Sequence, residues 1–192
     1  MPTDPTTRGE ARRAQLLEAA LRVIARGGVS AATHRAVAAE AGVPLGATTY
    51  YFKSREDMVA QAFELVVQRD QTALARARDE IVAAATDPAT LARAISKTLL
   101  RGLGEDPEVW VGEYELFIEA SRRPELKELA WAWTMAETDV LIPALERLGT
   151  RDPYRAARQI VAALVGMSLE VLAHGGREEL PEMVEDLVRR FA

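Results

Sequence analysis

The chain has no cysteine and only two histidines among its 192 residues. Without cysteine there are no disulfides, no cysteine-ligated zinc and no thiol chemistry, which suits a reducing cytoplasm. His34 and His174 occur in neither a Glu-x-x-His nor a His-Glu-x-x-His metal-binding pattern. Nucleophile-elbow, phosphate-loop and dinucleotide-binding sequences are also missing. We therefore expect no enzyme activity, no catalytic residue, no metal and no cofactor.

Long hydrophobic runs are missing as well. The first fifteen residues contain no apolar stretch of the kind found in secretory signals, and the uncharged apolar run at residues 159–169 is too short to span a bilayer. A hydrophobic content of 48% is enough to form a core in one or two domains. We expect a soluble, cytoplasmic protein with no membrane segment.

The net charge of −5 is unevenly distributed along the chain. Residues 1–55 carry eight basic and four acidic residues, a net charge of +4, whereas the remaining 16 basic and 25 acidic residues leave −9. A basic region is the part of an acidic protein that nucleic acid would contact. The residues ahead of the first helix, which we expect at about residues 12–26, form a basic arm that we expect to be disordered away from DNA.

Residues 33–53 predict two short helices joined by a tight turn. Thr33 is a suitable N-cap, Gly42 can close the first helix in a left-handed conformation, and Pro44 suits the first turn of the second helix. The second helix, residues 45–52, combines small residues that allow close approach to a duplex with tyrosines whose hydroxyls reach phosphates or base edges. This layout is typical of a helix-turn-helix. The alternatives are an ordinary small helical unit, or an edge strand at 48–52.

The same residues resemble the signature of the TetR family of transcriptional regulators, over roughly residues 10–70. The matching positions are Thr33, Arg35, Val37, Ala38, Ala41, Gly42, Val43, Gly46, Tyr50, Phe52, Lys53, Ser54, Arg55 and Glu56. Thr49 departs from the pattern, since many members have Leu or Ile there, and this predicts looser packing of the second helix.

The resemblance implies an all-α fold with a DNA-binding domain at residues 10–70, its helix-turn-helix at about 33–52, and a helical effector-binding and dimerisation domain at 71–192. The expected DNA contacts are Thr33, His34, Arg35, Pro44, Leu45, Gly46, Ala47, Thr48, Thr49, Tyr50, Tyr51 and Lys53.

The rest of the chain has a helical pattern. A long helix opens at Ser54, capped together with Asp57, and continues to about residue 85. Further helices are expected at about 88–104, 107–122, 124–149, 153–173 and 181–191, with a bend or interruption at Pro143. We expect the long helix to be the one covalent link between the domains and to couple them.

The segment 160–172 is apolar nearly all round. Ile160, Leu164, Met167 and Val171 are expected to face the core, and Val161, Val165, Leu169 and Leu172 to face outward. This describes either a central core helix or, as the family resemblance favours, a homodimer seam formed with the last helix in a four-helix bundle.

An aromatic cluster comes from residues 110–117 and 131–135. Such residues fill cores or line a pocket for a small organic effector, and the resemblance favours a pocket. The candidate lining residues are Trp110, Glu113, Tyr114, Phe117, Trp131, Met135, Met167 and Glu170. Trp133 belongs to the same cluster. Glu115 and Glu119 are further candidate anchors for a cationic ligand, or simply form an exposed face with Arg122.

The sequence thus predicts a dimeric repressor that binds a pseudo-palindromic double-stranded operator and is released by a small organic effector. A DNA-independent helical small-molecule-binding protein and a nucleoid-type architectural protein are the alternatives.

Overall fold

The computed structural model describes residues 5–105 and 107–191, and within these ranges the chain forms nine α-helices, two short 3-10 helices and no strand. The predicted all-α class is confirmed. The elements are α1 (Pro5–Gly27), η1 (Val29–Ala31), α2 (His34–Glu40), α3 (Leu45–Tyr51), α4 (Arg55–Ala83), α5 (Pro88–Glu105), α6 (Pro107–Glu119), η2 (Pro124–Leu126), α7 (Lys127–Arg147), α8 (Pro153–His174) and α9 (Leu180–Arg189).

The chain folds into two compact units. Unit 1 contains the described residues up to Gln68 together with Glu108–Ala130, and unit 2 contains Arg69–Pro107 together with the described residues from Trp131 onward. The chain therefore passes between the units three times, at 68/69, 107/108 and 130/131. We expected the long helix to be the one covalent link between domains divided at residues 70/71; between the two compact units, α6 and α7 also cross. The proposed division at residues 10–70 and 71–192 remains a prediction.

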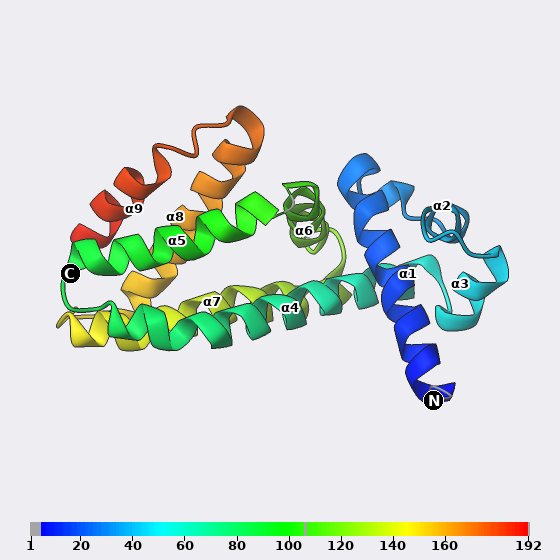
Figure 1. Cartoon of the computed structure of the whole chain (residues 1–192), viewed down its shortest axis with the longest axis horizontal. Helices are drawn as coiled ribbons and strands as arrows, with labels where there is room; N and C mark the ends of the chain where they lie inside the picture. The colour runs from blue at the N-terminus through cyan, green and yellow to red at the C-terminus, as the bar shows by residue number, and fades with distance from the viewer. Residues whose placement is uncertain (1–4, 106, 192) are drawn as a thin grey trace. The chain divides into compact units, whose positions relative to one another are not determined.

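Unit 1 is built on α1. Its apolar face of Leu16, Leu17, Ala20, Leu21 and Ile24 is buried, as the helical spacing predicts. The helix begins at Pro5 rather than near Arg12, so residues 5–11 are helical and do not form the expected disordered arm. In Figure 1 the blue α1 passes close to α2, which in turn contacts α3.

A close helix contact in unit 1 depends on Gly112 of α6. A Cβ added at Gly112 would lie 3.1 Å from the carbonyl oxygen of Leu21 and 3.3 Å from the Cβ of Ala25, both in α1. These distances are tighter than ordinary van der Waals contact, so the small residue allows α6 and α1 to approach closely.

Unit 2 has its own core, formed by residues from α4, α5, α7, α8 and α9. Figure 1 shows α5 and α9 side by side. Of the residues expected to face inward on α8, Ile160 is fully buried and Leu164 and Met167 pack against this core. Val161, expected to face outward, is also buried, so the inner face of α8 is broader at this end than the sequence suggested.

Proline marks the helix starts at Pro88, Pro107 and Pro153, as expected. Pro124 instead opens η2, and α7 begins only at Lys127. Pro143 does not interrupt α7, although proline removes one helical hydrogen bond. Leu141, Ala144 and Leu145 are buried around it, and this packing holds the helix continuous.

By length and composition alone, α8 is long and apolar enough to cross a membrane, with a mean hydropathy of 1.5. We expected no segment long enough to span a bilayer because we considered only the uncharged run at residues 159–169, and α8 is longer than that run. A core helix of a soluble protein passes the same test, and Ala157, Ile160 and Val161 of α8 are core residues.

Candidate nucleic-acid interface and effector domain

The turn between α2 and α3 is fixed by local hydrogen bonds. The Thr33 hydroxyl accepts a hydrogen bond from the backbone N–H of Ala36 at 3.2 Å and caps α2. Gly42 has a φ of +66°, and the N–H groups of Gly42 and Val43 donate to the carbonyls of Ala39 and Ala38 at 3.1 and 3.0 Å. This is a Schellman motif, which satisfies the last carbonyls of α2 and turns the chain sharply towards α3.

Polar contacts hold α2 against α1. Glu40 accepts hydrogen bonds from Arg22, at 2.7 Å, and from Arg26, and these two bonds lower the pKa of its carboxyl group. The Gln15 amide donates to the carbonyl of Ala41 at 2.9 Å. Arg22 and Arg26 contribute to the positive charge of the N-terminal sequence, but the structure uses both to anchor α2. No local pattern predicts this pairing, because eighteen and fourteen residues separate Arg22 and Arg26 from Glu40.

Helix α3 presents the most exposed aromatic ring among the described residues of unit 1. Tyr50 is 81% exposed and meets Tyr51 edge-on, with ring centroids 5.0 Å apart. Leu45, at the start of the helix, is 46% exposed. Phe52 is buried and takes an extended conformation that ends α3 one residue earlier than expected. Pro44 precedes the helix as its N-cap instead of lying in its first turn.

Thr48 is a correction to the predicted DNA contacts. Its side chain is fully buried, and its hydroxyl donates to the carbonyl of Leu45 at 2.8 Å. The methyl group of Thr48 is buried and its hydroxyl is already hydrogen-bonded within α3, so neither group can contact a DNA duplex. Thr48 therefore belongs to the inner face of α3, although the sequence suggested that 46–49 were too small or polar for a core.

The other predicted DNA contacts are at or near the surface of unit 1. The exposed ones are Thr33, Arg35, Pro44, Leu45, Gly46, Thr49, Tyr50 and Lys53. The half-buried ones are His34, Ala47 and Tyr51. The His34 Nδ1 atom is shielded from solvent. Arg35 therefore places exposed positive charge on α2, and Lys53 places it just beyond the end of α3.

The start of α4 is capped as the sequence predicts, with one difference. The Asp57 N–H donates to the Ser54 hydroxyl at 3.1 Å, but the Asp57 carboxylate accepts from the N–H of Lys53, at 2.8 Å. Asp57 also accepts from Gln61, and this hydrogen bond lowers the pKa of its carboxyl. Arg55 donates to the carbonyl of Val29 at 2.7 Å, so its guanidinium has a structural partner.

The predicted effector-binding residues divide between the two units. Trp110, Glu113, Tyr114 and Phe117 belong to unit 1, whereas Trp131, Met135, Met167 and Glu170 belong to unit 2. In unit 1 the rings of Trp110 and Tyr114 lie 5.9 Å apart, and Tyr114 is buried.

In unit 2, Trp131 is 56% exposed, and the guanidinium of Arg158 lies 5.2 Å from its ring centre. Met135 and Met167 are half-buried, and Glu170 is exposed. The placement of Trp131 and Glu170 at the surface differs from the lining role expected for them.

Glu119 was a candidate anchor for a cation, and the structure gives it partners. It accepts hydrogen bonds from Arg123 at 2.7 Å and Arg122 at 3.2 Å. Burial raises the pKa of Glu119, but the two arginines outweigh burial and hold the pKa below its ordinary value. Glu119 thus pairs with Arg122, as the alternative interpretation has it, but its side chain is only 15% exposed and does not lie on an exposed face.

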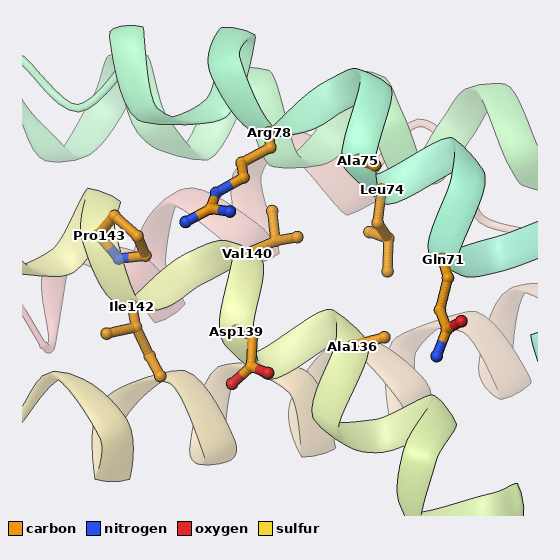
Figure 2. A pocket seen from close by; sticks show the side chains of 9 residues that line it. All are labelled: Gln71, Leu74, Ala75, Arg78, Ala136, Asp139, Val140, Ile142 and Pro143. Atoms are coloured by element: carbon orange, nitrogen blue, oxygen red, sulfur yellow. The ribbon is translucent and has the colours of Figure 1, made fainter.

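A groove of about 590 Å³ lies between α4 and α7 in unit 2. In Figure 2 the side chains of Gln71, Leu74 and Arg78 of α4 point toward α7; Ala75 of α4 and Ala136, Asp139, Val140, Ile142 and Pro143 of α7 complete the lining. None of the predicted effector-binding residues lines this groove. Its volume lies within the range of small-molecule sites, and most of its lining is apolar.

Comparison with known proteins places the chain in a family. The model described as "Bacterial regulatory proteins, tetR family" matches residues 16–62, which include α2 and α3. The model described as "Tetracyclin repressor-like, C-terminal domain" matches residues 86–192, more than half of the chain. The chain belongs to the TetR family of bacterial DNA-binding transcriptional regulators.

Individual relatives agree with this assignment. The nicotine-responsive transcriptional repressor HdnoR of Paenarthrobacter nicotinovorans is 27% identical over 186 residues, covering 94% of this chain and 93% of HdnoR. A TetR-family structure from Streptomyces coelicolor A3 is 33% identical with a TM-score of 0.71, covering 92% and 97%. The multidrug binding protein EbrR complexed with malachite green is 30% identical with a TM-score of 0.73, covering 94% and 97%.

Proposed function

We propose that this protein is a dimeric, cytoplasmic, non-enzymatic repressor that binds a pseudo-palindromic operator and is released by a small organic effector. The observation that carries the proposal is the exposed face of α3, where Tyr50 projects into solvent, together with exposed Arg35 in α2 and exposed Lys53 just after α3. The names of two relatives, a nicotine-responsive repressor and a multidrug binding protein, support a small organic effector.

Gly46 supports the role of α3 as the recognition helix. A Cβ added to Gly46 would meet no atom within 4 Å, and its φ is not positive. Neither space nor backbone conformation within the chain requires glycine here, although glycine weakens a helix relative to alanine. A bare backbone at an exposed position of α3 fits close approach to a DNA surface.

The outer face of α8 supports the dimer. Ala162, Gly166, Leu169 and Ala173 are all exposed and follow helical spacing along one face. This face is small and apolar, so a second copy can pack closely against it, with α9 completing a four-helix bundle. Two copies present two recognition helices to half-sites about 34 to 36 Å apart.

Release of the operator follows from a shift in the populations of two conformations of the repressor. The effector binds more tightly to the conformation whose two recognition helices are badly spaced for the operator, and operator affinity falls by that difference. Because α4, α6 and α7 all carry the chain from one unit to the other, each of the three is a route for coupling between effector and DNA.

A gel shift with the DNA upstream of the protein's own gene, against random competitor, tests the proposal. Specific binding is expected; absent binding would instead support a DNA-independent carrier, and indiscriminate binding an architectural protein. Tyr50→Ala is expected to weaken operator binding without loss of fold. Tyr154→Ala, which removes an exposed tyrosine of α8 in unit 2, is the matched control. Equal operator affinity in the two variants would reject α3 as the recognition helix.

The dimer is tested by Leu169→Glu, which places a charge on the outer face of α8. We expect a monomer in sedimentation analysis, with a folded spectrum by circular dichroism. Val111→Glu changes an exposed apolar residue of α6 and serves as the control. A dimer that survives Leu169→Glu would place the seam elsewhere.

A further inference from the structure

Asp70 in α4 is an acidic residue whose surroundings differ from those of the surface carboxylates. Its Oδ2 atom is shielded from solvent and has no hydrogen-bond partner among the described residues. Burial raises the pKa of the Asp70 carboxyl to about 6, and the nearby Trp133 side chain offsets part of that rise. No basic side chain in the described ranges forms an ion pair with Asp70. A covered carboxylate without a counter-charge is energetically unfavourable.

Asp70 and Trp133 do not line the groove themselves, but each lies one helical turn before a residue that does. Leu74, which lines the groove, lies one helical turn after Asp70 in α4, and Ala136 lies one turn after Trp133 in α7. Residues three or four apart are neighbours on a helix surface. The carboxylate and the indole therefore lie beside the end of the groove marked by Gln71 and Ala136, on the inner faces of the same two helices.

The groove and the carboxylate have complementary chemistry. Leu74, Val140 and Ile142 offer apolar surface to the body of a ligand. The basic residue of the groove, Arg78, is eight residues from Asp70 along α4, about 12 Å at 1.5 Å per residue. A cation at the Asp70 end is thus separated from Arg78, and it would gain a charge-assisted hydrogen bond to the Asp70 carboxylate.

We propose that Asp70, with Trp133 beside it, is the anchor of an effector site for amphipathic aromatic cations, whose apolar part occupies the groove between α4 and α7. This deepens the proposed function and rests on it for the biological role of the site. Cation binding itself needs no DNA and is measured separately. Ligand entry requires the covered Oδ2 atom of Asp70 to become accessible through a change of side-chain conformation.

Fluorescence titration of the full-length protein with proflavin, a three-ring aromatic cation, tests the proposal in the absence of DNA. Fluorescein, a three-ring aromatic anion, is the ligand control. Asp70→Asn removes the charge and keeps the shape of the side chain. Asp79→Asn, a substitution of the same type at an exposed position of the same helix, is the protein control.

We expect proflavin to bind the wild type and the Asp79→Asn variant with Kd values within a factor of two, and Asp70→Asn to weaken binding at least tenfold. We expect fluorescein binding not to weaken in Asp70→Asn. Circular dichroism verifies that each variant is folded. The inference is overturned if the folded wild type does not bind proflavin, or if Asp70→Asn binds it as tightly as Asp79→Asn.

The gel shift described above separates this inference from the proposed function. If the wild type binds no operator but proflavin binding depends on Asp70, the repressor proposal fails and the cation site stands. If the operator is bound specifically but proflavin binding is absent or does not depend on Asp70, the repressor proposal stands and the cation site fails.

Discussion

Asp70→Asn is expected to stabilise the protein, by an amount that depends on pH. The pKa of Asp70 is raised from 3.8 to about 6, so between these values the folded state binds a proton that the unfolded state has lost. The free energy of unfolding of the wild type therefore falls as the pH rises through this window. At about 1.4 kcal/mol per pKa unit, the full penalty is about 3 kcal/mol above pH 7. Asparagine does not titrate and avoids this penalty.

The assay is urea denaturation of the wild type and the variant at a series of pH values from 4.5 to 8, followed by circular dichroism. The variant's advantage should grow by about 2 kcal/mol over this range, because about 1 kcal/mol of the penalty is already present at pH 4.5. Asp79→Asn should change the free energy of unfolding by less than about 0.5 kcal/mol. A difference between variant and wild type that does not change with pH, or an asparagine variant that is less stable at pH 8, would refute the reasoning.

Three further predictions concern unit 1. Gly42→Ala should lower the free energy of unfolding by about 1 to 2 kcal/mol, because alanine is strained at a φ of +66°. Gly46→Ala should stabilise α3 by up to about 1 kcal/mol and weaken operator binding. Equal effects of the two substitutions on stability in denaturation experiments would argue against the turn at Gly42. Thr48→Val should destabilise the protein by about 1 kcal/mol through the lost bond to the Leu45 carbonyl, and the folded variant should keep its operator affinity in a gel shift, since a large loss would return Thr48 to the interface. Operator affinity should fall on the order of 10³-fold between 50 and 200 mM salt for about six phosphate contacts, and a flat salt dependence would rule out those contacts.

Local signals predicted the helix-turn-helix well. The Thr33 cap, the Gly42 turn and the Ser54 cap depend on backbone groups only a few residues away, so the sequence contains both partners of each interaction. The same is true of the prolines that start α5, α6 and α8, since proline restricts its own backbone wherever it occurs.

Side-chain orientation was predicted less well. Thr48 and Tyr50 are two residues apart in a helix only seven residues long, and both are compatible with an exposed or an inner position by residue type. The packing of α3 against its neighbours buries Thr48 and exposes Tyr50. The orientation of the proposed effector residues was equally hard to predict. Helical spacing shows which residues share a face of a helix, but it does not show which other residues cover that face.

The sequence by itself determined the helical class, the helix-turn-helix and the basic character of the N-terminal region, because these follow from periodicity, capping and composition. Only the tertiary structure decided that Arg22 and Arg26 pair with Glu40, that Thr48 is internal, and that Asp70 is covered beside Trp133. Hydrogen bonding of the backbone is local, whereas the burial and the charge partners of a side chain depend on residues far away in the sequence. Asp70 lies in a stretch of polar residues, and only the packing of α7 against α4 gives its carboxylate properties that a surface aspartate lacks.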